Sequence, residues 1–469
     1  MEATEDWGGT RMSRSPDLRS VFLARTEPTY ASSVDEALGR LLESSGLAPE
    51  PVGSASWNPL GAFVEAGDRV LVKPNWVSHQ NRSGAGSECL VTHTSVLRAV
   101  LRLLQKARPS AVIVGDAPLQ GCDFKALSRE GGLERLRDEF GEAFPTLDIR
   151  DFRLVTRRAG GLAARPTGTT RSPEDYVLFD LGATSQLEPI CSERTHFRVT
   201  MYDPDIIEAT HRRGVHQYLV AREIIAADVV INVPKVKTHK KSGFTGALKN
   251  LVGINGHKSY LPHHRKGAPP QGGDCYPQPD CRKRLTEELL DFVNRNAESR
   301  LAPLYAAAAR AAIRGQRALD GAFDLEGSWY GNDTVWRMTL DLQRIARFGR
   351  PDGSIAAEPQ RRMLHVADGI IAGQGEGPLA PDPLPLGIIS LGLSAAAVDL
   401  VNALLLGLDP ARIPLIRRAF DLEGFPPGEV VVFVDGERLT PEDAARRYGT
   451  HARPPSGWQG HCEWRSGSE

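Results

Sequence analysis

Short apolar runs that end in polar residues alternate with longer segments of helical periodicity, and this order constrains the fold more than any other feature. The run at 111–118 (AVIVGDAP), for example, follows a stretch at 95–107 in which Val and Leu recur at helical spacing. Such an order is typical of βαβ units with parallel strands. We therefore expect an α/β fold with a mainly parallel sheet flanked by helices, with long loop insertions. Strands are expected within 65–75, 111–118, 146–152, 228–234, 363–371, 386–391 and 430–434, and helices within 95–107, 124–140, 217–227, 285–319, 333–345 and 394–406.

The domain organisation follows from where this alternation begins and ends. One α/β domain is expected over 19–450, or two lobes over about 60–230 and 231–450 with the site between them. The ends, 1–18 and 451–469, are expected to be a disordered and an irregular tail. Residues 155–194 are rich in Gly, Pro, Thr and Ser, which indicates an insertion or a β-hairpin excursion. Residues 235–282 read as a long loop, and loops of that length inside a domain are usually functional.

Charge and hydropathy exclude several classes of partner. The formal net charge is -1, so no overall field attracts nucleic acid or an anionic membrane. No apolar run reaches the roughly 18 residues of a membrane span, since the best candidate, 385–406, contains Asp399. The first residues lack a basic region followed by an apolar stretch. We expect a cytoplasmic protein without nucleic-acid or membrane partners, and the oligomeric state stays open.

The six cysteines predict neither a disulfide framework nor an iron–sulfur cluster. They stand at 89, 122, 191, 275, 281 and 462, and none forms a C-x-x-C pair. An iron–sulfur cluster needs closely spaced thiolates. No iron–sulfur cluster is therefore expected, and the cofactor is left open, with a divalent metal as one option.

The distribution of lysine is more informative than its total. The chain has eleven lysines against 46 arginines, and eight of the lysines lie between Lys235 and Lys283. Arg and Lys are not interchangeable where a compact or titratable amine is needed. Several of these lysines are therefore expected to face an anionic substrate; the alternative is a solvated basic loop. The adjacent Lys240 and Lys241 are expected at the solvated surface.

Polar residues follow the expected strands at three places. Lys73 and Asn75 flank Pro74 after the first strand, Asp116 ends the second, and Asp368 ends a later one. A strand-end lysine can pair with an anion or act as a base when desolvated, and a carboxylate suits cation binding or general-base chemistry. Surface turns explain Lys73 and Asp116 equally well.

Three further residues have both a chemical and a structural reading. His93 precedes a helix, where it is an acid/base, a metal ligand or simply a capping residue. Glu376 lies in a Gly-rich stretch at 373–378 that could cover a ligand. Asp399 stands within an apolar helix, so it is expected to be paired or to cap.

The segment 234–253 gives the strongest signal. In an extended chain Lys235 and Lys237 point to one face, because side chains alternate, and Thr238 and His239 add a hydroxyl and an imidazole. The glycines of GFTGALKNLVG let the backbone approach a ligand closely. A helical turn over 245–252 would offer free amides to an anion, although the spacing is not that of a Walker loop.

Taken together, these motifs resemble the family called domain of unknown function 362. Many relatives in that family carry a ferredoxin-like module with clustered cysteines, a pattern this chain lacks. The resemblance implies more about fold than about activity. It rests on VKPN at 72–75, GDAP at 115–118, VPKVKTH at 233–239, GALKNLVG at 246–253, GNDT at 331–334 with Trp336, DGI at 368–370, GEGP at 375–378 and AVD at 397–399.

Three functional hypotheses remain. The first is an enzyme of isomerase, epimerase or transferase type acting on a small carboxylate or phosphate. The second is a metal-dependent enzyme with a His/Asp site, and the third is a non-enzymatic binding or assembly protein. The expected catalytic residues are His239, His93, Asp116 and Lys73; the expected substrate-binding residues are Asn75, Lys235, Lys237, Thr238, Lys249, Asn250, Gly246 and Glu376; the expected metal ligands are Asp368 and Asp116.

Overall fold

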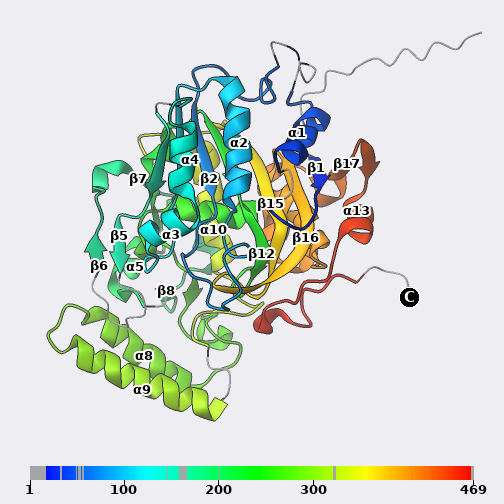
Figure 1. The fold of residues 1–469 in the computed structure, drawn as a ribbon. Helices are drawn as coiled ribbons and strands as arrows, with labels where there is room; N and C mark the ends of the chain where they lie inside the picture. The colour runs from blue at the N-terminus through cyan, green and yellow to red at the C-terminus, as the bar shows by residue number, and fades with distance from the viewer. Residues whose placement is uncertain are drawn as a thin grey trace, which may run out of the picture.

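An eleven-stranded mixed sheet forms the centre of the molecule (Figure 1). The computed structural model describes residues 17–31, 34–48, 50, 54, 57–144, 146–157, 166–199, 201–320 and 324–465. The strand order is β18 (Glu437–Leu439), β17 (Val431–Val434), β1 (Ser20–Arg25), β16 (Ala380–Gly392), β15 (Arg362–Glu376), β11 (Val229–Val233), β2 (Arg69–Pro74), β3 (Ala111–Asp116) and β4 (Asp148–Asp151). Two further strands branch from β15: β12 (Lys235–His239) pairs with it, and β13 (Gly243–Thr245) pairs with β12.

The run from β15 through β11, β2 and β3 to β4 is entirely parallel. This confirms the expected α/β fold, in which the strands ending near Lys73, Gly115 and Pro234 share one sheet. Their apolar residues serve both faces. Val70 and Val72 belong to the core under helices α1 and α2, whereas Leu71 belongs to the core on the opposite face. A strand covered on both sides reads as a continuous apolar run for this reason.

Helices cover both faces of the sheet. On one face lie α1 (Val34–Ser45), α2 (Thr94–Ala107), α3 (Phe124–Glu130) and α4 (Leu133–Phe140), in front of the strands in Figure 1. The other core includes residues of α7 (Ala247–Asn250), α10 (Val335–Phe348), α11 (Ala395–Leu405), α12 (Pro414–Glu423) and α13 (Pro441–Tyr448). The parallel strands therefore end between two helical layers, where α/β proteins place their ligands.

Smaller units surround this core. A three-stranded sheet is formed by β7 (Tyr176–Asp180), β10 (Val215–Ala221) and β9 (His211–Arg212), and two-stranded ladders by β5 (Val155–Arg157) with β6 (Pro166–Gly168) and by β8 (Phe197–Arg198) with β14 (His264–Arg265). For 155–194 an insertion or a β-hairpin excursion was expected, and the antiparallel β5–β6 ladder is consistent with the hairpin. Helices α5 (Pro204–Thr210) and α6 (Arg222–Ala226) adjoin these strands, and α8 (Cys281–Arg295) and α9 (Ala302–Asp320) form a hairpin beside the body of the molecule (Figure 1).

The central sheet draws on both of the ranges considered as separate lobes. β2, β3 and β4 lie in 60–230, and β12, β15 and β16 lie in 231–450. β11 pairs with β2 on one side and with β15 on the other. The join between the two ranges is therefore a strand in the middle of one sheet.

Two segments expected to be loops are extended and buried instead. Residues 235–239 and 243–245 form the hairpin β12–β13, every residue of which is buried. The Gly-rich stretch 373–376 continues β15 as a strand paired with β16 rather than a ligand-covering loop. Both segments are rich in Gly, Lys or Pro, and composition alone could not show that neighbouring strands satisfy their backbone groups.

The helix expected over 217–227 is also a correction. Residues 215–221 form β10, with alternating burial, and only 222–226 are helical. The sequence there, VHQYLVA, is rich in β-branched and aromatic residues, which favour a strand.

The C-terminal residues are irregular but packed. Apart from a short 3-10 turn, Ser456–Trp458, residues 451–465 have little regular structure. Trp458 is nevertheless buried, and its Nε1 donates to the Lys240 carbonyl at 2.9 Å. A Cβ at Gly243 would come within 2.9 Å of the Trp458 ring, so this glycine permits the tail to cover the β12–β13 turn.

Candidate functional site

Two buried lysine–aspartate pairs stand at the carboxyl ends of the parallel strands. Lys73 Nζ lies 2.6 Å from Asp116 Oδ1, and the Trp76 amide donates to Asp116 Oδ2 at 2.6 Å. Neither side chain of the pair is more than 4% exposed. Burial lowers the pKa of Lys73, and Asp116 partly offsets this. The sequence placed both residues at strand ends, and the β2–β3 pairing brings them into contact.

Lys235 and Asp368 form the second pair. Lys235 Nζ lies 2.8 Å from Asp368 Oδ2, and both side chains are fully buried. Tyr30 donates its hydroxyl to Asp368 Oδ1 at 2.7 Å, and the His93 amide donates to Oδ2 at 3.0 Å. The Ile370 amide also donates to Oδ1, at 3.4 Å. The carboxylate is thus neutralised and held by four donors, which makes it a poor metal ligand.

His93 lies beside this second pair. Its Nδ1 accepts from the Ser95 amide and caps α2, and its ring stacks on Tyr30 with centroids 3.7 Å apart. Burial lowers its pKa to about 4, so the imidazole is neutral at neutral pH. Of the roles considered for His93, its contacts are those of a capping residue.

A chain of buried amides connects the strand ends. Asn250 Nδ2 donates to Asn232 Oδ1 at 2.7 Å and to the Lys73 carbonyl at 3.0 Å. Asn75 Nδ2 donates to Asn250 Oδ1 at 3.0 Å, and its own Oδ1 is buried without a partner among the described residues. Asn232 also donates to His365 Nδ1 at 3.0 Å. Sequence reasoning missed Asn232 and His365, although an amide inside the apolar run DVVINVP was a visible signal.

Three buried lysines have no carboxylate partner in the part of the chain that the structure describes: Lys237, Lys249 and Lys258. Their exposed fractions are 0%, 9% and 9%. Lys237 Nζ donates to the Leu90 carbonyl, and the ammonium groups of Lys249 and Lys258 make no hydrogen bond within the described chain. An uncompensated buried ammonium is costly, so such a group loses its proton or binds an anion.

The pKa values of these three lysines are lowered, because burial disfavours the charged ammonium. Burial, with the nearby charge of Lys235, lowers the pKa of Lys237 to about 7. Burial, with the charges of Lys258 and Lys241, lowers that of Lys249 to about 7. The pKa of Lys258 falls to about 8, chiefly through burial, even though Asp116 opposes the change. The charges of these three lysines therefore act on the pKa values of one another or on the Lys73–Asp116 pair. We call Lys237, Lys249 and Lys258 the lysine cluster.

Neutral polar groups border the lysine cluster. His239 Nδ1 accepts from the amides of Lys241 and Ser242 at 3.0 and 3.2 Å, which leaves the ring proton on Nε2. Burial and then Lys249 hold the pKa of His239 well below its usual value. Thr245, opposite Lys237 in the β12–β13 ladder, has a buried hydroxyl without a partner among the described residues. His239 Nε2 and this hydroxyl offer donors for a ligand.

The expected anion site at the α7 amides is already filled by the protein. Asp399 accepts from the amides of Ala247 and Leu248 at 2.5 and 2.9 Å. A Cβ at Gly246 would come within 2.1 Å of Asp399 Oδ1, so the glycine makes this contact possible. The capping role expected for Asp399 is confirmed, and free amides at this turn are a wrong prediction.

A second glycine brings the chain after α7 against the first ion pair. A Cβ at Gly253 would lie 1.9 Å from Asp116 Oδ1 and 2.8 Å from Lys73 Nζ. The Gly253 carbonyl also accepts from the Ala117 amide at 2.8 Å. Close backbone approach therefore packs the segment leading to Lys258 onto the strand ends.

Several predicted residues are placed away from this cluster or are occupied. Thr238 donates to the Gly375 carbonyl at 2.9 Å, and Glu376 is exposed at the end of β15, where it accepts from the Ser456 amide. Lys240 and Lys241 are not at a solvated surface: their Nζ atoms lie 2.8 and 3.6 Å from Glu326. Both lysines lie in the turn between β12 and β13, and sequence composition could not show that Glu326 pairs with them there.

The comparisons with known proteins agree with the motifs. The profile of the domain of unknown function 362 matches residues 70–167 and 179–403. The chain belongs to the domain of unknown function 362 family. The matched ranges contain the lysine cluster and both lysine–aspartate pairs.

Two proteins that match this chain are distant from it in sequence. A thylakoid-associated protein of Synechocystis sp. is 25% identical over 397 residues, which are 85% of this chain and 77% of that protein. A solved protein of Thermotoga maritima is 11% identical, over 85% of this chain and 60% of that one, with a TM-score of 0.34. That likeness is too weak to support an argument about fold or function. No helix in the described ranges is both long and apolar enough to cross a membrane.

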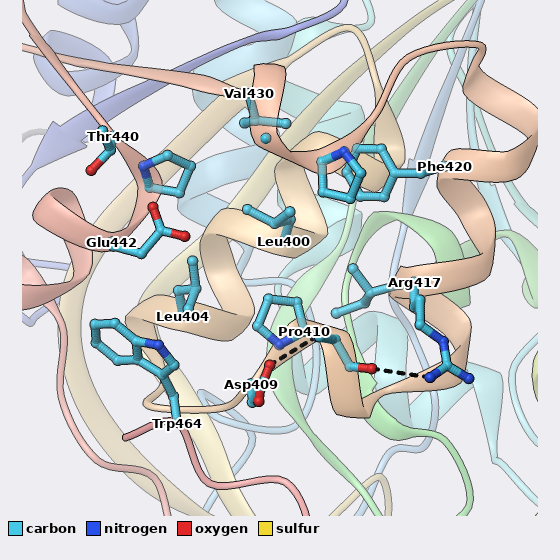
Figure 2. Close-up of a pocket in the computed structure, with 15 residues that line it drawn as sticks. Leu400, Leu404, Asp409, Pro410, Arg417, Phe420, Val430, Thr440, Glu442 and Trp464 are labelled. Carbon is cyan, nitrogen blue, oxygen red and sulfur yellow. Dashed lines mark hydrogen bonds between the residues drawn. The ribbon is translucent and has the colours of Figure 1, made fainter. Parts of the chain in front are cut away.

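A separate cavity of about 290 Å³ lies between α11, α12 and α13 (Figure 2). Its lining is mainly apolar, with Leu400, Leu404 and Phe420 around it. Asp409 already accepts from the Ala411 amide, and Arg417 donates to the Ala411 carbonyl. Asp409 and Arg417 thus serve the local chain, and none of the residues predicted from the sequence lines this cavity.

Proposed function

We propose that this family member is an enzyme that binds a small carboxylate or phosphate at the lysine cluster. The observation that supports the proposal is the burial of Lys237, Lys249 and Lys258 without carboxylate partners in the described chain. Two neighbouring lysines, Lys73 and Lys235, do have such partners. The fold thus supplies counter-ions to some buried lysines and leaves the others for a ligand.

The chemistry that suits this cluster is proton transfer. A lysine with a pKa of about 7 is half neutral at neutral pH, which is the condition a general base needs. One lysine can hold the anion while the other removes a proton from the carbon next to it. Isomerisation or epimerisation is therefore favoured, and group transfer remains an alternative.

The other two hypotheses receive less support. A His/Asp metal site would use Asp116 and Asp368, but each carboxylate is paired with a buried lysine. A binding protein without catalysis would also use the lysine cluster, and turnover of a bound anion separates it from an enzyme. We also propose the cytoplasmic location that the sequence led us to expect. The Synechocystis relative, by contrast, is described as thylakoid-associated.

A thermal-shift series with anions tests the proposal. Sulfate, phosphate, malonate and succinate are compared with chloride at equal ionic strength, at pH 6 and at pH 9. A ligand present at a hundredfold excess over its Kd stabilises the native state by about 2.7 kcal/mol. We expect at least one anion to raise the melting temperature at pH 6.

The lowered pKa values predict at which pH an anion stabilises the protein more. The lowered pKa values mean that the native lysines lose protons above pH 7 to 8, whereas unfolded lysines keep theirs until about pH 10.4. Without a ligand, native stability therefore rises with pH between these limits. The cluster attracts anions only when charged, so stabilisation by sulfate or succinate should be larger at pH 6 than at pH 9. Equal shifts at both pH values, or none at either, would contradict the proposal.

A further inference from the structure

A turn beside the three-stranded sheet β7–β10–β9 brings together a carboxylate, a thiol and an imidazole. Glu188 opens the 3-10 turn Glu188–Ile190, and Cys191 follows directly. In a 3-10 helix residues three apart lie on the same side, so the carboxylate and the thiol face one way. They face His216 of β10, which is fully buried.

The distances between the donor atoms match those around one metal ion. Glu188 Oε2 lies 3.1 Å from His216 Nε2, and Cys191 Sγ lies 3.7 Å from the same nitrogen. All three atoms lie within 4.8 Å of one another. Tetrahedral zinc with its usual bond lengths sets nitrogen–oxygen separations of roughly 3.4 Å and nitrogen–sulfur separations of roughly 3.6 Å.

We propose that Glu188, Cys191 and His216 bind a zinc ion through Oε2, Sγ and Nε2. The mixed oxygen, sulfur and nitrogen set suits a borderline-soft cation such as Zn²⁺ better than Mg²⁺ or Ca²⁺, which prefer oxygen alone. Binding displaces the thiol proton of Cys191 to solvent, and the imidazole binds in its neutral form. A water molecule completes the fourth position.

The surroundings favour a bound cation over a simple hydrogen bond. The Gly214 amide donates to Glu188 Oε2 at 2.8 Å and fixes the carboxylate toward His216. The Glu188 side chain is 22% exposed, which gives an ion access from solvent. His216 Nδ1 and His211 Nδ1 are both buried without a partner among the described residues, and the two rings lie 5.7 Å apart.

Zinc binding would give these two nitrogens opposite hydrogen-bonding roles. His211 Nε2 bonds to the Tyr260 carbonyl at 2.9 Å, so its proton is on Nε2 and its Nδ1 is an acceptor. Zinc on His216 Nε2 puts the proton of that ring on Nδ1, which becomes a donor. A hydrogen bond from His216 Nε2 to Glu188 would instead leave an acceptor nitrogen at Nδ1 of both rings, whose centroids are 5.7 Å apart.

The test is a metal titration of the full chain after dialysis against a chelator. Co²⁺ is the spectroscopic probe, because a cobalt–thiolate bond gives a charge-transfer absorption in the near ultraviolet, and Zn²⁺ competes for the same site. We expect about one equivalent of Co²⁺ with this band, displaced by Zn²⁺. Cys191→Ser should abolish the band, and Cys281→Ser, which changes an exposed cysteine, should leave it unchanged.

A second variant keeps the test valid if Cys191→Ser does not fold. Glu188→Gln keeps one acceptor oxygen, which can serve the Gly214 amide and His216, but it loses the charged ligand. We expect the cobalt band to persist with an affinity at least about tenfold weaker. The proposal is overturned if the wild-type chain gives no thiolate band, if the band depends on Cys281, or if Glu188→Gln binds Co²⁺ as tightly as the wild type.

Discussion

Asp116→Asn is expected to lower the free energy of unfolding by about 3–5 kcal/mol, because it leaves Lys73 as a buried charge without its counter-ion. The substitution is nearly isosteric, so it removes charge rather than volume. Lys73 is fully buried, and Asp116 Oδ1 lies 2.6 Å from its Nζ. Urea denaturation at pH 7 measures the change.

Asp138→Asn is the matched control. Asp138 is exposed on α4, and the same substitution there should change stability by less than about 0.5 kcal/mol. A small effect for Asp116→Asn as well would show that Lys73 is uncharged in the native protein. The distinction between buried lysines with a carboxylate partner and those without one would then no longer hold.

Lys249→Met should act in the opposite direction on stability and strongly on binding. In the absence of ligand it removes an uncompensated buried amine, so we expect the free energy of unfolding to rise by about 1–2 kcal/mol. Anion affinity should fall about 100-fold or more, since losing one partner of a buried charge pair costs roughly 2–5 kcal/mol. Methionine keeps much of the side-chain volume and flexibility.

Stability and anion affinity are both measured, for Lys249→Met and for a control variant. Lys125→Met, at an exposed lysine of α3, should change neither stability nor affinity measurably. A purely structural role for Lys249 predicts that Lys249→Met destabilises the protein and leaves anion affinity unchanged. That result would remove Lys249 from the site.

The sequence predicted the parallel core and much of its polar edge because both depend on local patterns. Lys73 and Asp116 end apolar runs, and parallel pairing of neighbouring strands then brings their side chains together. Thr94–Ala107 and Ala395–Leu405 were recognisable as helices from their periodicity. These features need no knowledge of distant contacts.

The remaining features of the site depend on contacts between residues far apart in the chain. Tyr30 reaches Asp368 across 338 positions, and Asp399 reaches the α7 amides across about 150. Lys258 was one of eight clustered lysines, and only the close approach permitted by Gly253 distinguishes it. The composition of 235–282 predicted a long loop rather than strands, because burial of lysines in a strand requires neighbours that composition does not reveal.

Proton uptake on anion binding tests the central claim most directly. Calorimetric titrations with the anion that stabilises best, sulfate or succinate, are run at pH 8 in two buffers with different enthalpies of ionisation. At this pH Lys237 and Lys249, with pKa values of about 7, are mostly neutral before binding, and a bound anion restores their protons. The account predicts uptake of about one to two protons per anion. Binding heats that are identical in the two buffers, or no binding at all, would contradict it.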